Sequence, residues 1–437
     1  MGPDHGGEVW DCGHGVIDYS SNINPLGPSR LALKTLESWK LECYPPPNPV
    51  KLKKALARHV GVSQENITLG NGSMELIKDF CTVFLKKTDS TVVLEPAFSE
   101  YARYARLYGK SVKRTLPKMG FEHSIKGIIK SLDRDTRLLF LGRPNNPTGW
   151  TIPDRDLKEV LDFTRDRDVL VFLDEAFIDF THLNSFGKEV GGYENLFVLR
   201  SFTKFFALPG LRIGYGIGER QVIERLEEIK PPWNINVFAH DAALASLKDR
   251  PYMERTKKLV ERERAFLVKG IRELGITVYP SSVNFLLLRY NWNSRDVKEE
   301  LLKEGLLVRD CSNFHGLDTR FIRVSVKKRK DNQSLIDALK KQVEKGVKKG
   351  VECAYYPCHF EGQDCTYCFC PFYPCGDRVR GRFIIGRKGK KVWTCKDCSD
   401  VHRPAVVKRV KALLKGTKKE LDFEKRLAIK KTVLWLL

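Results

Sequence analysis

The chain has 437 residues, and its 76 Lys and Arg outnumber its 54 Asp and Glu, which gives a formal net charge of +22. The length predicts two or three domains, and a hydrophobic content of 42% is enough for a sizeable core. No apolar run reaches about 18 residues and the N-terminus lacks a charged-then-apolar signal pattern, so we expect a cytoplasmic protein without a membrane span.

Residues 1–45 indicate an extended N-terminal arm, because glycine and proline exclude a continuous helix over its first 30 residues. The arm contains His5-Gly6-Gly7 and, further on, the string Asn22-Ile23-Asn24-Pro25-Leu26-Gly27-Pro28. A mobile arm with a histidine and glycine amides could fold over a bound phosphate compound and exclude water. The alternative is a disordered tail.

Strand and helix patterns alternate between residues 65 and 220. The apolar, β-rich runs lie at 91–95, 138–142, 169–174, 196–202 and 211–217, and the helical patterns at 73–86, 98–108 and 155–167. This alternation predicts a mostly parallel sheet with helices on both faces and a ligand site at the ends of its strands.

Three motifs precede the centre of this region. Gly72 and Ser73 lead into a helical pattern, where backbone amides suit a phosphate. Asn146 lies in a turn fixed by two prolines and can donate to a phenolate oxygen on a ring. Asp174 ends a buried strand, where a carboxylate can pair with a pyridinium nitrogen and keep it protonated.

The central stretch runs from Ser201 to Gly214. A lysine that forms a Schiff base needs a partly neutral amine, which neighbouring cations and apolar walls promote for Lys204. Ser201, Thr203 and Arg212 could hold a phosphate dianion beside it. This layout is the one that pyridoxal 5'-phosphate (PLP) requires. For this stretch alone, the alternative is a surface lysine in a polar turn.

Residues 236–345 predict a second, smaller α/β unit. Its helical patterns lie at 237–249 and 252–274, and its strands at 284–289, 306–309 and 320–326. In the last strand Arg323 shares a face with Phe321 and Ser325, and a buried arginine without an anion would be costly. Arg309 follows another apolar run, and we expect Arg320 to be solvated.

Together and in this order, the motifs resemble the aspartate-aminotransferase-like (fold type I) PLP enzymes. Lys204 lies 30 residues after Asp174 and 58 after Asn146, spacings similar to those of that family. The resemblance implies an α/β fold with a large PLP-binding domain at 46–235 and a small domain at 236–345. It implies Lys204 and Asp174 as the catalytic residues. The implied cofactor contacts are Tyr44, Gly72, Ser73, Phe98, Asn146, Asp174, Ser201, Thr203, Lys204 and Arg212.

Two of these residues depend on the resemblance alone. Tyr44 matches a tyrosine that reaches the neighbouring subunit's cofactor phosphate, which implies a homodimer with shared sites. Phe98 matches the aromatic residue that stacks on the pyridine ring. The alternatives are a tyrosine packed on the adjacent prolines and a phenylalanine of the core. Phe177 departs from the many members that have a tyrosine there, so Asn146 would be the main phenolate donor.

The arm closely resembles that of the threonine-phosphate decarboxylases of the cobalamin pathway. This implies decarboxylation of L-threonine O-3-phosphate to (R)-1-amino-2-propanol O-2-phosphate. The implied contacts to the phosphorylated amino acid are His5, Gly6, Asn24, Arg309 and Arg323. Histidinol-phosphate aminotransferases have similar motifs and provide the alternative. A hypothesis of a different class is a nucleic-acid-binding or regulatory module with a vestigial PLP core.

After a stretch at 340–350 that we interpret as a linker, residues 351–437 form a basic, cysteine-rich segment. Twelve cysteines in a cytoplasmic chain indicate metal rather than disulfides, and two Cys-x2-Cys pairs separated by 26 residues favour zinc. An iron–sulfur cluster is the alternative. The candidate ligands are Cys353, Cys358, Cys365, Cys368, Cys370, Cys375, Cys395 and Cys398.

The role of this segment is open. A β-hairpin is predicted around the turn Arg387-Lys388-Gly389-Lys390, and basic helical patterns follow His402. The charge would allow contact with nucleic acid, but no aromatic platform for RNA is visible, so we expect none. A further hypothesis is a threonine kinase site at this turn, although no Walker A pattern supports it.

Overall fold

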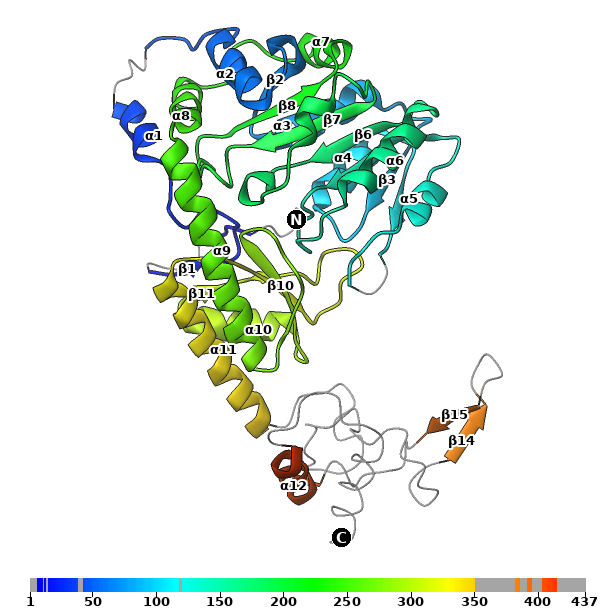
Figure 1. Cartoon of the computed structure of the whole chain (residues 1–437), viewed down its shortest axis with the longest axis vertical. Coiled ribbons are helices and arrows are strands. Elements are labelled where there is room, and N and C mark those ends of the chain that lie inside the picture. The colour runs from blue at the N-terminus through cyan, green and yellow to red at the C-terminus, as the bar shows by residue number, and fades with distance from the viewer. Residues whose placement is uncertain are drawn as a thin grey trace. The chain divides into compact units, whose positions relative to one another are not determined.

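The computed structural model describes residues 6–10, 12, 15–37, 42–117, 120–349, 382–385, 391–394 and 403–414 (Figure 1). His5, the eight candidate metal ligands and the turn proposed for a kinase site lie outside these residues. The chain divides into two units, Met1–Leu339 and Lys340–Leu437, which are described one after the other.

A seven-stranded sheet forms the centre of the first unit. Its strands follow the order β2 (Ile67–Asn71), β8 (Ile213–Gly218), β7 (Leu196–Ser201), β6 (Leu170–Asp174), β5 (Thr136–Gly142), β3 (Ser90–Leu94) and β4 (Ser111–Thr115). Strand β8 runs antiparallel to both of its neighbours, and all other pairs are parallel. The prediction of a mostly parallel sheet is therefore confirmed.

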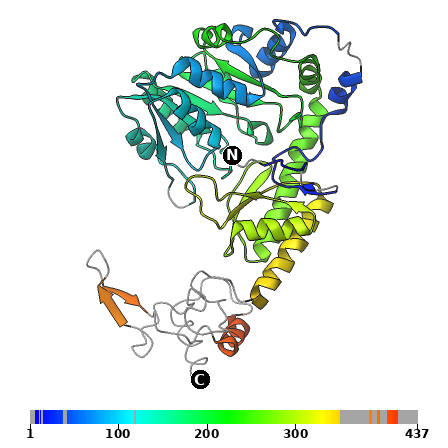
Figure 2. The same cartoon turned by 180° about the vertical axis from the view of Figure 1, so that it is seen from behind.

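Helices cover both faces of this sheet, as the two opposite views show (Figures 1 and 2). Successive residues of a strand point to opposite faces, so Leu138 and Phe140 of β5 belong to one core cluster and Leu139 and Leu141 to another. The first cluster includes α3 (Ser73–Phe84), α4 (Ser99–Tyr108) and α7 (Arg220–Glu228). The second includes α2 (Val50–Val60), α5 (Ile125–Ser131), α6 (Asp154–Arg165) and α8 (Val237–Lys248).

A second, antiparallel sheet has the order β12 (Arg309–Asp310), β13 (Phe321–Ser325), β10 (Phe285–Arg289) and β9 (Thr277–Val278). Three helices belong to this region: α9 (Arg250–Glu273), α10 (Ser294–Lys303) and α11 (Arg329–Lys349). Arg329 Nε lies 2.8 Å from Glu263 Oε2 and ties α11 to α9. The N-terminal arm joins this region because β1 (Ile17–Asp18) pairs in parallel with β11 (Leu306–Leu307). Farther along, α1 (Arg30–Lys34) contacts α8.

The prediction of a linker at 340–350 is wrong for most of this range, because α11 continues through it to Lys349. Lysine, glutamine and glutamate are good helix formers, and one internal glycine costs only about 1 kcal/mol. The helix is also anchored by tertiary contacts, since Leu335 and Leu339 lie buried on one of its faces.

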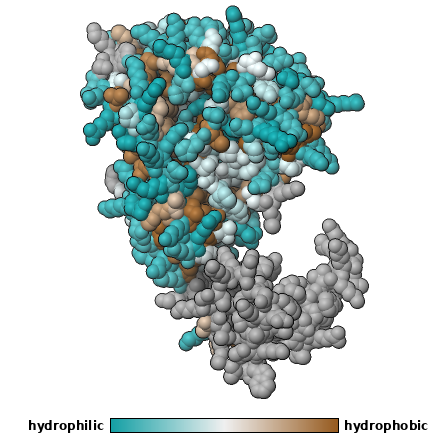
Figure 3. Space-filling model, in the orientation of Figure 1, coloured by the Kyte–Doolittle hydropathy of each residue, from teal (hydrophilic) through white to brown (hydrophobic). Residues whose placement is uncertain are grey.

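In the second unit, β14 (Arg382–Ile385) and β15 (Lys391–Thr394) pair in antiparallel fashion, which confirms the predicted hairpin. Helix α12 (Pro404–Leu414) follows, as the basic helical pattern predicted. In the described part of the chain, no helix is both long and apolar enough to cross a membrane. The face of the first unit in Figure 3 is mainly hydrophilic, with smaller hydrophobic patches.

Candidate active site

The topology of the large sheet gathers the central motifs at one edge. Asp174 ends β6, Asn146 follows β5, and Lys204 follows β7. Because these three strands are parallel neighbours, their carboxyl ends meet at the same edge of the sheet. The antiparallel strand β8 begins at the same edge, directly after Arg212. These residues line a pocket of about 360 Å³. It is also lined by Gly6, Ser20, Ser21, Asn22, Ser73, Phe98, Tyr101, Phe177, Ser201, Thr203, Arg309, Asn313, Phe314 and Arg323.

The amine of Lys204 is set up to lose its proton near neutral pH. Burial and the guanidinium groups of Arg323 and Arg212 lower the pKa of Lys204 to about 8. Each of these influences disfavours the charged ammonium. A substantial neutral fraction is what a lysine needs in order to react with an aldehyde.

Asp174 is held by two hydrogen bonds. Tyr101 Oη donates to Asp174 Oδ2 at 2.5 Å, and the backbone N–H of Ala176 donates to Oδ1 at 2.8 Å. Burial raises the pKa of Asp174 above its usual value, although both hydrogen bonds oppose this rise. A cationic ring nitrogen beside the carboxylate would supply the missing counter-charge.

A cradle for an anion lies at the N-terminus of α3. Gly72, with φ of 77°, caps this helix, and an added Cβ there would lie 2.3 Å from Arg212 Nη2. Ser201 Oγ and Thr203 Oγ1 are hydrogen-bonded at 2.8 Å in the same pocket. Helix amides, two hydroxyls and a guanidinium together form a donor set that suits a phosphate.

The three residues predicted to lie around the cofactor ring, Phe98, Asn146 and Phe177, all line the pocket. Phe98 lines the pocket at the N-cap of α4, and the buried Phe177 lines it without a hydroxyl to donate. Asn146 Oδ1 accepts a hydrogen bond from Arg323 Nη1, and Asn146 Nδ2 donates no hydrogen bond to another described residue. The amide N–H groups of Asn146 are therefore available as donors to a ligand.

Two buried arginines approach the pocket from the small sheet. Strand β13 carries Arg323, whose Nη2 donates to the backbone oxygen of Ser20 at 2.5 Å and whose buried Nε has no hydrogen-bond partner in the described part of the chain. Within the described residues Arg323 forms no ion pair, and burial lowers its pKa to about 10. Arg309 donates to Asn313 Oδ1 at 2.9 Å and to the backbone oxygen of Asp310 at 2.8 Å.

The arm reaches the pocket through Gly6 and the segment Ser20–Asn22. The backbone N–H of Gly7 donates to Ser20 Oγ at 2.8 Å, and a Cβ on Gly6 would lie 2.3 Å from Ser20 O. Asp18 accepts hydrogen bonds from the backbone and hydroxyl of Ser20. The arm is thus packed against the residue that also contacts Arg323.

Two of the predicted contacts, Asn24 and Tyr44, do not line this pocket. Asn24 Nδ2 donates to Phe205 O at 2.7 Å and to the hydroxyls of Tyr252 and Thr256 at 2.8 Å, so among the described residues this side chain acts as an anchor for the arm. Tyr44 is 80% exposed and packs against Trp233 with ring centroids 5.0 Å apart. Its contact with a second subunit stays a prediction.

Sequence reasoning missed Tyr101, Ser20 and Asn313. Tyr101 follows Phe98 by three residues at the start of α4, a spacing that places two side chains on the same side of a helix. That spacing was visible in the sequence. The other two depend on loop conformations that no local pattern defines.

Comparison with known proteins agrees with this geometry. Residues 14–339 match the family model described as aminotransferase class I and II. The chain belongs to the aminotransferase class I and II family. It therefore has the fold type I PLP-dependent α/β fold. Residues 345–425 match the model of a cysteine-rich small domain.

Relatives with two different activities are similar to the chain. A protein of Caldanaerobacter subterraneus, provisionally named threonine-phosphate decarboxylase, is 39% identical over 79% of this chain and 95% of its own length. The crystal structure of histidinol-phosphate aminotransferase from Clostridium acetobutylicum has a TM-score of 0.71 at 34% identity and covers 75% of this chain and 99% of its own. That of L-threonine-O-3-phosphate decarboxylase from Porphyromonas gingivalis has a TM-score of 0.66 at 25% identity, with the same coverage.

The family implies PLP, and the residues of the pocket fit it. A Cβ on Gly72 would occupy space next to the Arg212 guanidinium, as expected of a cradle that must stay open for a phosphate. Burial raises the pKa of Asp174, so a cationic ring nitrogen beside it would supply a favourable counter-charge, and the lowered pKa of Lys204 favours the neutral amine that reacts with an aldehyde. For the metal prediction, the described residues contain no cluster of ligands, and the candidate cysteines lie outside them.

Proposed function

We propose that the chain is a PLP-dependent decarboxylase that converts L-threonine O-3-phosphate to (R)-1-amino-2-propanol O-2-phosphate for cobalamin synthesis. The observation that carries this proposal is Arg323, a buried guanidinium in the same pocket as Lys204 that forms no ion pair within the described residues. A buried cation of this kind calls for an anionic partner, and a substrate carboxylate matches its planar, bidentate geometry.

The distribution of donors suits a substrate with two anionic ends. Arg323 would take the carboxylate, while Arg309 and the arm at Gly6 would take the phosphate. L-threonine O-3-phosphate has both groups, whereas histidinol phosphate has a phosphate but no carboxylate. The relative that is 39% identical also favours the decarboxylase.

When bound, PLP supplies an electron sink for the substrate bond that lies perpendicular to its ring. Asp174 would hold the proton on the ring nitrogen, and Asn146 would donate to the ring oxygen. Arg323 would orient the carboxylate perpendicular to the ring, so that Cα–CO2 breaks rather than Cα–H. Lys204, as the ammonium, would then give a proton to Cα and become the neutral amine, while the arm excludes water.

Histidinol-phosphate aminotransferase is the second candidate, supported by the Clostridium structure at 34% identity. Release of CO2 from L-threonine O-3-phosphate, compared with transamination of histidinol phosphate by 2-oxoglutarate, separates the two. Transamination without CO2 release would reject the decarboxylase.

Three further assignments belong to this proposal. The chain forms a homodimer in which Tyr44 serves the neighbour's cofactor phosphate. The arm spans residues 1–45, the large domain 46–235, the small domain 236–345 and the cysteine-rich domain 351–437. The last domain binds zinc or an iron–sulfur cluster, which metal analysis of the purified full chain would identify.

A threonine kinase site in this domain is a separate hypothesis, tested by incubating the full chain with ATP and threonine and measuring phosphothreonine.

A further inference from the structure

A second polar hollow, of about 280 Å³, lies apart from the active-site pocket and shares no lining residue with it. It forms between the end of α2, the segment that joins β6 to β7, and α9. The polar residues that matter here are His59, Asp179, Asn184, Lys188, Arg200 and Lys257.

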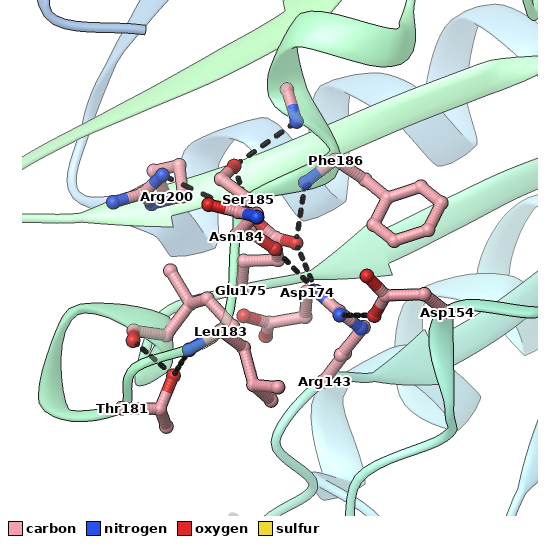
Figure 4. A network of polar contacts seen from close by, with 12 residues as sticks. Arg143, Asp154, Asp174, Glu175, Thr181, Leu183, Asn184, Ser185, Phe186 and Arg200 are labelled. Carbon is pink, nitrogen blue, oxygen red and sulfur yellow. Dashed lines mark hydrogen bonds and ion pairs between the residues drawn. The ribbon is translucent and has the colours of Figure 1, made fainter.

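The carboxylates around this hollow are already paired. Arg200 Nη2 donates to Asp179 Oδ1 at 2.6 Å, and Arg200 Nη1 lies 3.8 Å from Glu175 Oε2. Glu175 lies between Arg200 and Arg143, as Figure 4 shows, and Arg143 Nη1 approaches it to 3.1 Å. Ser185 and the backbone N–H of Phe186 also donate to Glu175. Neither carboxylate is left to neutralise another cation.

The two lysines of the hollow have no such partner. Lys188 is exposed and Lys257 is half-buried, and neither forms an ion pair with any described residue. Burial lowers the pKa of His59, the Asp179 carboxylate opposes this shift, and the cations of Arg200, Arg250 and Lys257 add to it, so Lys257 acts on the imidazole beside this hollow. The exposed Asn184 adds an amide at the same place.

We propose that this hollow binds a phosphate group, as inorganic phosphate or as a phosphomonoester. A dianion would be contacted by the ammonium groups of Lys188 and Lys257, with the amide of Asn184 as a neutral donor. Flexible lysines are common phosphate ligands, and a doubly charged group gains more from two cations than a single carboxylate does. The hollow is large enough for a small phosphomonoester.

The test is calorimetric titration of the PLP-loaded full chain at low ionic strength, with inorganic phosphate in one arm and glycerol phosphate in the other. The active-site arginines provide a separate phosphate site, so the wild type should show two binding events. The double variant Lys188→Ala/Lys257→Ala should weaken one of them about tenfold or more, since each lost charge-assisted contact is worth about that factor.

The matched control is Lys126→Ala/Lys258→Ala, which removes the same charge from exposed lysines outside the hollow. It should keep both binding events. The single variant Lys188→Ala, at an exposed side chain, should fold and show part of the loss. The proposal is rejected if the hollow variants and the control bind both phosphate compounds as the wild type does. A preference for one compound in the lost event identifies the source of the phosphate.

Discussion

The phenolic oxygen of Tyr101 lies 2.5 Å from Asp174 Oδ2, and this hydrogen bond links α4 to the end of β6. The ring of Tyr101 stacks on Phe140 with an interplanar angle of 4°, which holds the hydroxyl in place. Because the bond is to the charged form of the carboxylate, it opposes the rise in the pKa of Asp174 that burial causes. Tyr101 is therefore a positioning residue for Asp174.

We predict that Tyr101→Phe lowers kcat/KM about tenfold. Removing the donor raises the pKa of Asp174 further, so a higher pH is needed to keep this carboxylate ionised. The acid limb of the pH–activity profile should consequently move to higher pH. Tyr104→Phe, at a half-buried tyrosine of the same helix, is the control and should leave the profile in place. An unmoved acid limb in Tyr101→Phe would contradict the assigned role.

For Arg323→Lys we expect the KM for L-threonine O-3-phosphate to rise about tenfold or more. Lysine keeps the positive charge but cannot bind a carboxylate bidentately. It also lacks the second terminal nitrogen of arginine, so the hydrogen bond that Arg323 Nη2 donates to Ser20 O is lost. Steady-state kinetics measure this effect. Arg320→Lys is the control, because Arg320 is exposed and pairs with Asp318 instead. Equal KM values for the two variants would show that Arg323 does not hold the substrate.

The lowered pKa of Lys204 predicts the pH dependence of PLP uptake by cofactor-free protein. The neutral amine is the reactive form, so the uptake rate should increase as pH rises through about 8. Arg323→Gln removes the largest neighbouring charge that depresses this pKa, and the midpoint should move to higher pH. Stopped-flow absorbance measures the rate, with Arg320→Gln as the control. A common midpoint in both variants would refute this electrostatic coupling.

The elements that the sequence predicted best are those with strong apolar patterns. Strands β5, β6 and β7 lie within two residues of their predicted bounds, because both faces of these strands are buried and their apolar runs are continuous. Strand β4 was missed since its residues, Ser111–Thr115, are half-buried and polar at the edge of the sheet. The short helices α5 and α10 were missed as well, because their sequences carry many charged or small residues.

The candidate active site shows the same contrast between residues that a sequence pattern could place and residues that it could not. Parallel strand ends brought Asn146, Asp174 and Lys204 together, as topology alone required. Asn24 shows the limit of a motif, because its amide is used by Phe205, Tyr252 and Thr256 rather than facing the pocket. These partners come from α9 and the Lys204 segment, which are 181 to 232 residues away in the chain, so no local pattern could reveal them.

Gly72→Ala tests the phosphate cradle directly. The added Cβ would lie 2.3 Å from Arg212 Nη2, so the guanidinium must move away from the N-terminus of α3. We expect PLP affinity to fall about tenfold or more, since a charge-assisted contact to phosphate is displaced. The matched control is Gly61→Ala, because Gly61 also has a positive φ, 88°, but nothing lies within 4 Å of an added Cβ. Gly61 is in the left-handed helical region, so Gly61→Ala should lose about 1 kcal/mol of stability. Gly72, with φ of 77° and ψ of 160°, is in a region that side chains rarely adopt, so Gly72→Ala should lose roughly 1–3 kcal/mol. Only Gly72→Ala should weaken PLP binding in a fluorescence titration, and equal affinities would mean that Arg212 does not hold the phosphate.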